Sequence, residues 1–299
     1  FGTNDPTPWP PEVPAGENPP AGAILDYFLP ADATGPVTLE VVDAGARVIR
    51  SYSSADSVLA PDPALDPAAY DQVCRQRPQS TFCGLPLYWP APQMAISTRA
   101  GMHRVAWDMR LQPIDTAKVM DAGDVGATGA VPHKSVTPPA APWAPPGRYT
   151  VRLTVAGKRY TQPLVLRLDP RVKTSAVGLA QLAALSREMY DRAVATHAAY
   201  QQARALVTTL DSGSARRAQV ESLAPAPRPR GRGFGFGRPN PAEPPTLESA
   251  SNALLQAAMA MQGADVAPTA AQVAACARAR TQAATVMAKW ARLKRRGAR

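Results

Sequence analysis

The chain has 299 residues, a formal net charge of +10, 33 prolines and 57 alanines. This length suits one to three domains, and the proline content predicts long stretches without regular structure. Residues 1–173 carry 16 basic and 16 acidic side chains, whereas residues 174–299 carry 17 basic and 7 acidic ones. The sequence has no run of 18 apolar residues, which argues against a membrane span.

The first 20 residues include seven prolines, a composition that favours extended polyproline structure. We interpret residues 1–20 as a proline-rich linker. The N-terminus has neither an initiating Met nor the basic and then apolar pattern of a signal peptide. We therefore expect a processed chain or an excised piece of a longer protein.

Residues 21–170 contain six segments in which apolar and polar residues alternate, as in strands with one buried face. These segments are 24–29, 37–42, 47–52, 102–109, 149–155 and 160–168. They predict an antiparallel, Ig-like β-sandwich, with a tight turn at Ala156-Gly157-Lys158 between the last two strands. Two long loops, 54–92 and 111–146, interrupt the strands and either cover the sheet edges or contact another domain.

Two of the three cysteines, Cys74 and Cys83, lie close together in the first long loop. A disulfide between them would contribute about 2–3 kcal/mol in the chain-entropy model and would suit an exported protein. Two unrelated surface thiols are the alternative. The spacing and the lack of a nearby histidine disfavour zinc.

Residues 171–299 change to a helical period. A first helix is predicted from Thr174 or Ser175, with apolar residues every three or four positions along one stripe. These are Leu182, Leu185, Met189, Ala193, Thr196, Tyr200, Ala203, Val207 and Leu210.

Two further helices complete a predicted three-helix antiparallel bundle. The second covers residues 246–261 and stops at Gly263. The third begins at a capping box formed by Thr269 and Gln272 and continues through Val273, Cys276, Met287 and Trp290 to about Leu293. A low-complexity insertion at 225–245, which we expect to be disordered, separates the first two helices.

Few residues suggest catalysis. The only histidines are His103, His133 and His197, too few for a multi-histidine metal centre. His103 and Asp108 fall on opposite faces of one strand, so they cannot act as a base and its orienting partner, and we expect His103 to pack in the sandwich. No nucleophile elbow, glycine-rich phosphate loop or paired-cysteine metal motif appears. We predict no catalytic, cofactor or metal residues.

Two basic segments allow another interpretation. Residues 228–238 combine four arginines with two phenylalanines and four glycines, and residues 278–299 carry eight basic and no acidic side chains. Charge with aromatic stacking suits single-stranded nucleic acid or another polyanion. Solvated appendages, with basic charge favourable at a helix C-terminus, are the simpler interpretation.

Two motifs carry a resemblance to a known family. The first runs Gly101-Met-His103-Arg-Val-Ala-Trp107-Asp108, and the second runs Pro146-Gly147-Arg-Tyr149-Thr-Val. Together they resemble the hook-capping type of Ig-like domain. Nearly the whole chain is similar to the C-terminal region of secreted bacterial β-propeller proteins with sortilin-like or Asp-box (BNR) repeats, which are often labelled glycosyl hydrolases.

The resemblance implies structural roles and no catalytic residue, because the chain lacks the Ser-x-Asp-x-Gly-x-x-Trp box of the propeller. Trp107 is expected to fill the core, Asp108 to fix the turn after its strand, and Pro146-Gly147 to set the start of the next strand.

The implied function is a non-catalytic accessory module of an extracellular or periplasmic protein, with the upstream propeller as partner and a protein or glycan as ligand. One alternative is a glycan hydrolase that uses Asp115, Asp121 and Asp124, since glycosidases need two facing carboxyl groups. The other is a polyanion-binding protein that uses the two basic segments.

Overall fold

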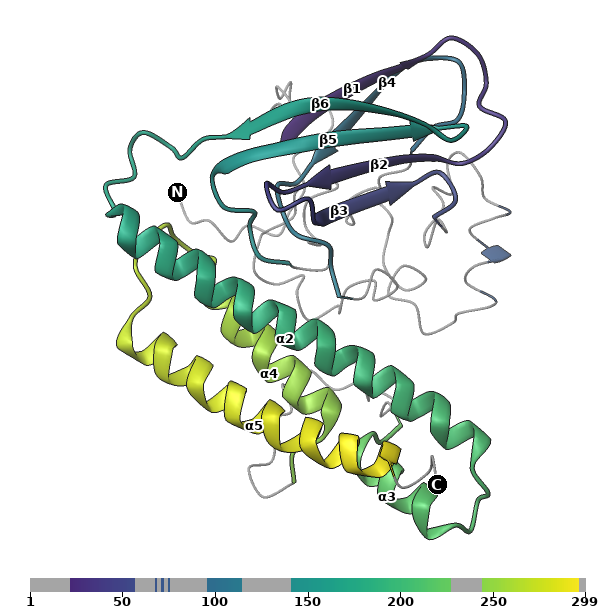
Figure 1. Cartoon of the computed structure of the whole chain (residues 1–299), viewed down its shortest axis with the longest axis vertical. Helices are drawn as coiled ribbons and strands as arrows, with labels where there is room; N and C mark the ends of the chain where they lie inside the picture. Colours follow the sequence, from purple (N-terminus) through teal and green to yellow (C-terminus); the bar gives the residue numbers. More distant parts are fainter. Residues whose placement is uncertain are drawn as a thin grey trace, which may run out of the picture. The chain divides into compact units, whose positions relative to one another are not determined.

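The structure, a computed structural model, describes residues 22–56, 68, 71–72, 75, 96–114, 141–226 and 244–295. These residues form an α+β protein with two antiparallel sheets and four helices. The chain divides into two compact units, Phe1–Leu168 with the sheets and Asp169–Arg299 with the helices (Figure 1). The boundary expected from the sequence lay at residue 170.

The larger sheet has four strands in the order β3-β2-β5-β6. Its members are β2 (Val37–Val42), β3 (Val48–Ser53), β5 (Gly147–Val155) and β6 (Lys158–Leu166). The smaller sheet pairs β1 (Ala23–Leu29) with β4 (Gly101–Trp107). All six strands predicted from alternation are confirmed, and the burial of successive residues alternates in β1 and β4.

A tight turn joins β5 to β6. Ala156 and Gly157 have φ of 47° and 77°, and Val155 pairs directly with Lys158. Two successive left-handed residues make a type I′ turn, whose twist matches that of the flanking strands. The predicted turn is therefore confirmed, with an alanine in a position that usually holds Asn, Asp or Gly.

The buried side chains of the first unit come from both sheets. Trp107 of β4 and Tyr149 of β5 meet edge to face, with ring centroids 5.8 Å apart. Val37 and Val41 from β2 and Val105 from β4 are also buried. The Trp107–Tyr149 contact therefore joins the two sheets.

The second unit contains α2 (Ala176–Thr209), α3 (Ala215–Leu223), α4 (Leu247–Met259) and α5 (Ala270–Arg295). Figure 1 shows α2, α4 and α5 side by side, and each pair of them is in contact. Alanines at the buried positions of all three let the helix axes approach closely. Ala193, Ala250 and Ala283 are examples, each at most 3% exposed.

The predicted helix starts are confirmed by their caps. The Ser175 hydroxyl accepts a hydrogen bond from the Gly178 amide at 3.2 Å, which makes Ser175 the N-cap of α2. At α5, the Thr269 amide donates to Gln272 Oε1 at 2.9 Å and the Gln272 amide donates to Thr269 Oγ1 at 3.2 Å. This reciprocal pair is the capping box read from the sequence.

Helix α3 was not predicted, and it contacts both α2 and α5. It is capped by Ser214 and buries only Val220 and Leu223. Two apolar anchors in nine residues give too short a pattern to reveal a 3.6-residue period. Another correction concerns Val273, placed on the buried stripe of α5 but 49% exposed.

Much of the predicted irregular sequence lies outside the described residues: 1–21, most of 54–92, 115–140 of the second long loop and 227–243 of the insertion. The two ends of the second loop are described and lie together. The Leu111 amide donates to the Pro142 carbonyl at 3.0 Å, and the Ala144 amide donates to the Met109 carbonyl at 2.7 Å. Backbone hydrogen bonds therefore hold residues 109–111 next to residues 142–144.

Candidate functional site

The Trp-Asp motif ends β4 and turns the chain. Trp107 is fully buried, and its indole Nε1 donates to the Arg110 carbonyl at 2.9 Å. The Asp108 carboxylate accepts from the Arg110 amide at 3.1 Å, while Met109 between them has φ of 57°. The aspartate thus forms an Asx-type turn around a left-handed residue, and the tryptophan fastens the same turn to the core.

A half-buried cluster of charges surrounds this turn. Arg50 lies opposite the buried Val41 in the sheet register and so faces the core. Its guanidinium donates to the Leu111 carbonyl at 3.1 Å and lies 3.5 Å from the Asp108 carboxylate. An arginine on the core face of an edge strand is thus neutralised by the aspartate of the motif.

Tyr52 lies beside Arg50 on the same face of β3. The Arg50 guanidinium lies over the Tyr52 ring, 4.9 Å from its centroid. In the described part of the chain, neither the Tyr52 hydroxyl nor Arg50 Nε has a hydrogen-bond partner, although both atoms are buried. Burial raises the pKa of Tyr52, and the nearby Arg50 charge partly opposes that rise.

Arg110 forms the other side of the cluster. Its guanidinium carbon lies 3.7 Å from the centroid of the Trp143 ring, and Nη1 donates to the Ala141 carbonyl at 2.7 Å. Burial lowers the pKa of Arg110, and Asp108 opposes this effect. These contacts join residues 108–110 to residues 141–143, so the role of Arg110 is structural.

The remaining motif residues also stabilise the local backbone conformation. The ring of His103 packs 4.9 Å from that of Tyr27, and its Nε2 lies 2.7 Å from the Arg99 carbonyl. Gly101 has φ of 119°, which favours glycine. The Tyr149 hydroxyl donates to the Pro145 carbonyl at 2.5 Å, fixing the Pro146-Gly147 entry to β5.

The outward face of the smaller sheet carries a feature that the sequence reasoning missed. We call it the β1–β4 outer face: Ile24, Asp26 and Phe28 of β1, opposite Ala106, Arg104 and Met102 of β4. Phe28 is 62% exposed, Met102 70% and Ile24 41%. The sequence did indicate this face, because both β1 and β4 have apolar residues at odd and even positions and therefore on both faces of the sheet.

A second surface lies along α5, which contains no acidic residue. Arg278, Gln282, Thr285, Lys289 and Arg292 follow one another at spacings of four and three, so they share one stripe. We call these five residues the α5 basic stripe. No ion pair involves its three cations within the described residues, whereas Arg280 on another face is paired with Glu188 at 2.8 Å.

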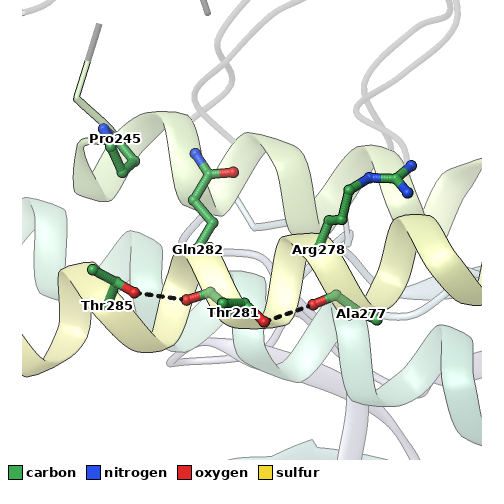
Figure 2. Close-up of a pocket in the computed structure, with 6 residues that line it drawn as sticks. All are labelled: Pro245, Ala277, Arg278, Thr281, Gln282 and Thr285. Carbon is green, nitrogen blue, oxygen red and sulfur yellow. Dashed lines mark hydrogen bonds between the residues drawn. The ribbon is translucent and has the colours of Figure 1, made fainter. Parts of the chain in front are cut away.

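A shallow groove of about 470 Å³ adjoins this stripe and is drawn in Figure 2. Pro245 forms one side, and α5 forms the other through Ala277, Arg278, Thr281, Gln282 and Thr285. The Thr281 and Thr285 hydroxyls donate to backbone carbonyls one turn earlier, at 3.1 and 3.0 Å. Arg278 and Gln282 are then its main side-chain donors, a set that can hold a polar group but offers no acid or base.

Several predicted site residues lie outside the described residues: Cys74, Cys83, His133, Asp115, Asp121, Asp124 and residues 228–238. His197 is described, and its Nε2 lies 3.0 Å from the Gln201 amide on α2. The described residues contain no group of three metal-ligating side chains. None of the helices in this part of the chain is long and apolar enough to cross a bilayer.

Comparison with known proteins adds no relative. No family model matches the sequence, and searches of curated proteins and of solved structures give no significant match.

Proposed function

We propose that the chain is a non-catalytic accessory and interaction module, the C-terminal region of an exported β-propeller protein of the sortilin-like, Asp-box class. The first unit is then an Ig-like β-sandwich of the hook-capping type, and the second is an antiparallel bundle of α2, α4 and α5. Its partner is the upstream propeller of the same polypeptide, and its location is extracellular or periplasmic.

The observation that carries this proposal is that the motif residues have structural roles. Trp107 fills the core, Asp108 holds a turn and neutralises Arg50, and Tyr149 fixes the start of β5. Residues engaged in this way are the signature of a scaffold and not of a reactive centre. The exposed apolar β1–β4 outer face supports an interaction role.

The coding sequence upstream of Phe1 tests the proposal directly. We expect it to encode Asp-box repeats and an export signal in the same reading frame. A frame that encodes neither would remove the proposed partner and overturn the proposal. Glycan hydrolysis by the purified chain, lost in Asp115→Asn, Asp121→Asn or Asp124→Asn, would instead favour the hydrolase alternative.

The α5 basic stripe favours a second candidate function, binding of a polyanion. Three cations on one face of a 26-residue helix, with no ion pair among the residues that the structure describes, can contact phosphates of one strand. We would measure binding of single-stranded DNA by fluorescence anisotropy over a range of salt concentrations, comparing two triple variants. The test variant is Arg278→Gln, Lys289→Gln, Arg292→Gln, and the charge-matched control is Arg148→Gln, Lys158→Gln, Arg159→Gln.

If the stripe binds DNA, the test variant should lower the slope of log affinity against log salt by about 2, because each phosphate contact on a single strand contributes about 0.7. The control should leave the slope unchanged. Equal effects of the two variants would show attraction by net charge alone and would eliminate the stripe as a site.

A further inference from the structure

The β1–β4 outer face carries apolar residues at both of its ends. Cross-strand pairing sets Phe28 directly opposite Met102, and Ile24 directly opposite Ala106. The two large side chains at one end are 62% and 70% exposed. Single exposed apolar residues are ordinary, but neighbouring ones on one face indicate a surface that contacts another molecule.

The centre of this face carries a charged pair. Arg104 Nε and Nη2 donate to the two carboxylate oxygens of Asp26 at 2.8 and 3.0 Å. The Asp26 side chain remains 42% exposed and that of Arg104 65% exposed. Any partner must therefore present apolar groups at the ends and a matching pair of opposite charges in the middle.

A second copy of the chain meets this requirement. We propose that two copies associate through their β1–β4 outer faces, about a twofold axis that runs parallel to the strands. This axis lays β1 of one copy on β4 of the other, so each residue faces the cross-strand neighbour of its own counterpart. The arrangement is isologous and closes as a dimer.

The contacts follow from the register. Phe28 meets Met102 of the partner subunit, a sulfur–aromatic contact, and Ile24 meets Ala106 of the partner subunit. Asp26 meets Arg104 of the partner subunit, so four charges alternate in sign around the axis. A twofold axis across the strands would instead set Asp26 against Asp26 of the partner subunit, and like-charge contacts are unfavourable. The charges thus select the first axis.

The size of the face sets the expected affinity. Six outward residues per copy are few compared with the roughly 20–30 residues a side of a standard interface. A dissociation constant on the order of 0.1 mM is therefore expected. This proposal does not depend on the proposed function, because it concerns the isolated 299-residue chain.

Sedimentation equilibrium of the purified chain, from about 10 μM to about 1 mM, tests the proposal over the range that a weak interface requires. We expect the mass to rise from 31.6 kDa toward twice that value. Phe28→Ser and Met102→Ser should each weaken association about tenfold, because each removes a large apolar side chain from both symmetry-related contacts. Val177→Ser, which replaces a 68% exposed valine on α2, is the matched control and should have no effect.

A charge exchange tests the axis. Asp26→Arg and Arg104→Asp should each abolish self-association, whereas their equimolar mixture should regain it, because unlike variants restore both charge contacts. The exposed pair adds little to folding, and association in the mixture would itself show that both variants are folded. A wild-type chain that stays monomeric at the highest concentration, or a dimer that survives Asp26→Arg, overturns the proposal.

Discussion

Two buried tyrosines of the first unit differ in how their hydroxyl groups are used. Tyr52 and Tyr149 are each 7% exposed. The Tyr149 hydroxyl donates to the Pro145 carbonyl at 2.5 Å, whereas that of Tyr52 has no partner within the described residues. Removing an unpaired buried hydroxyl relieves a desolvation cost, but removing a bonded one leaves a carbonyl unsatisfied.

We therefore expect the two Tyr→Phe changes to have opposite effects. Tyr149→Phe should lower the free energy of unfolding by about 1 kcal/mol, and Tyr52→Phe should leave it unchanged or raise it by up to about 1 kcal/mol. Urea unfolding followed by tryptophan fluorescence measures both. Equal destabilisation by the two changes would show that the Tyr52 hydroxyl has a partner, such as an ordered water.

The environment of Arg50 shows why the direction of an individual side chain in a strand could not be predicted from the sequence. The alternation of apolar and polar residues predicted β3. However, a register shift between Val41 and Val42 interrupts the pairing of β2 with β3. As a result Ile49, Arg50 and Tyr52 are all largely buried, which simple alternation forbids. A bulge depends on the partner strand, so no pattern within residues 47–52 could reveal that Arg50 faces the core.

The β5–β6 hairpin contains a strained turn residue that can be improved. Ala156 has φ of 47°, a left-handed conformation that costs a residue with a Cβ atom about 1–2 kcal/mol. Asn tolerates this position, and Asn-Gly is the preferred type I′ pair. Ala156→Asn should raise the free energy of unfolding by about 1 kcal/mol.

The matched comparison for that turn is Gly157→Ala, at φ of 77°. It should destabilise the first unit, although no atom lies within 4 Å of the added Cβ, because the cost arises in the backbone. Thermal unfolding measures both variants. A gain in stability from Gly157→Ala would contradict the backbone explanation.

Glu188 on α2 links two helices and should make their packing sensitive to pH. Its carboxylate accepts from Arg280 of α5 at 2.9 and 2.8 Å and from Arg192 at 2.9 Å. The hydrogen bond from Arg280 is the main cause that lowers the pKa of Glu188, although partial burial opposes it. A carboxyl whose pKa is lower in the folded state stabilises that state above its unfolded pKa, and this contribution disappears as the pH falls through the folded pKa.

The stability difference between the wild type and Glu188→Gln should therefore be largest near neutral pH and shrink as the pH falls below about 4.5. Arg280→Gln should flatten the same pH dependence, because it removes the main cause of the shift. Unfolding in urea at several pH values measures this. A difference that stays constant into the acid range would show that Glu188 acts through packing alone.

Helix prediction succeeded where a stripe and a cap coincide. Ser175 and the Thr269–Gln272 pair mark the starts of α2 and α5 because cap chemistry is local to a few residues. The sequence did not predict contacts between distant residues. The Arg280–Glu188 pair joins positions 92 residues apart. The β1–β4 outer face depends on the pairing of strands more than 70 residues apart. The motif residues were identified, but their hydrogen bonds depend on that tertiary arrangement.

The division of the chain into two compact units predicts two unfolding transitions instead of one. Each unit has its own core, with Val41 fully buried in the sheets and Leu254 fully buried among the helices. Multi-domain chains commonly depart from two-state behaviour for this reason. Leu254→Ala should weaken the helical unit by about 2–5 kcal/mol and leave the protection of the strands unchanged.

Val41→Ala is the reciprocal change and should weaken only the sheets, by about 1–3 kcal/mol, because a smaller side chain is removed. Native-state hydrogen exchange distinguishes the two units, since amides of β2 and β5 report on one core and amides of α2 and α4 on the other. Two units that unfold separately would each lose protection only when their own core is altered. Equal loss throughout the chain after either change would instead show that the units unfold as one cooperative body.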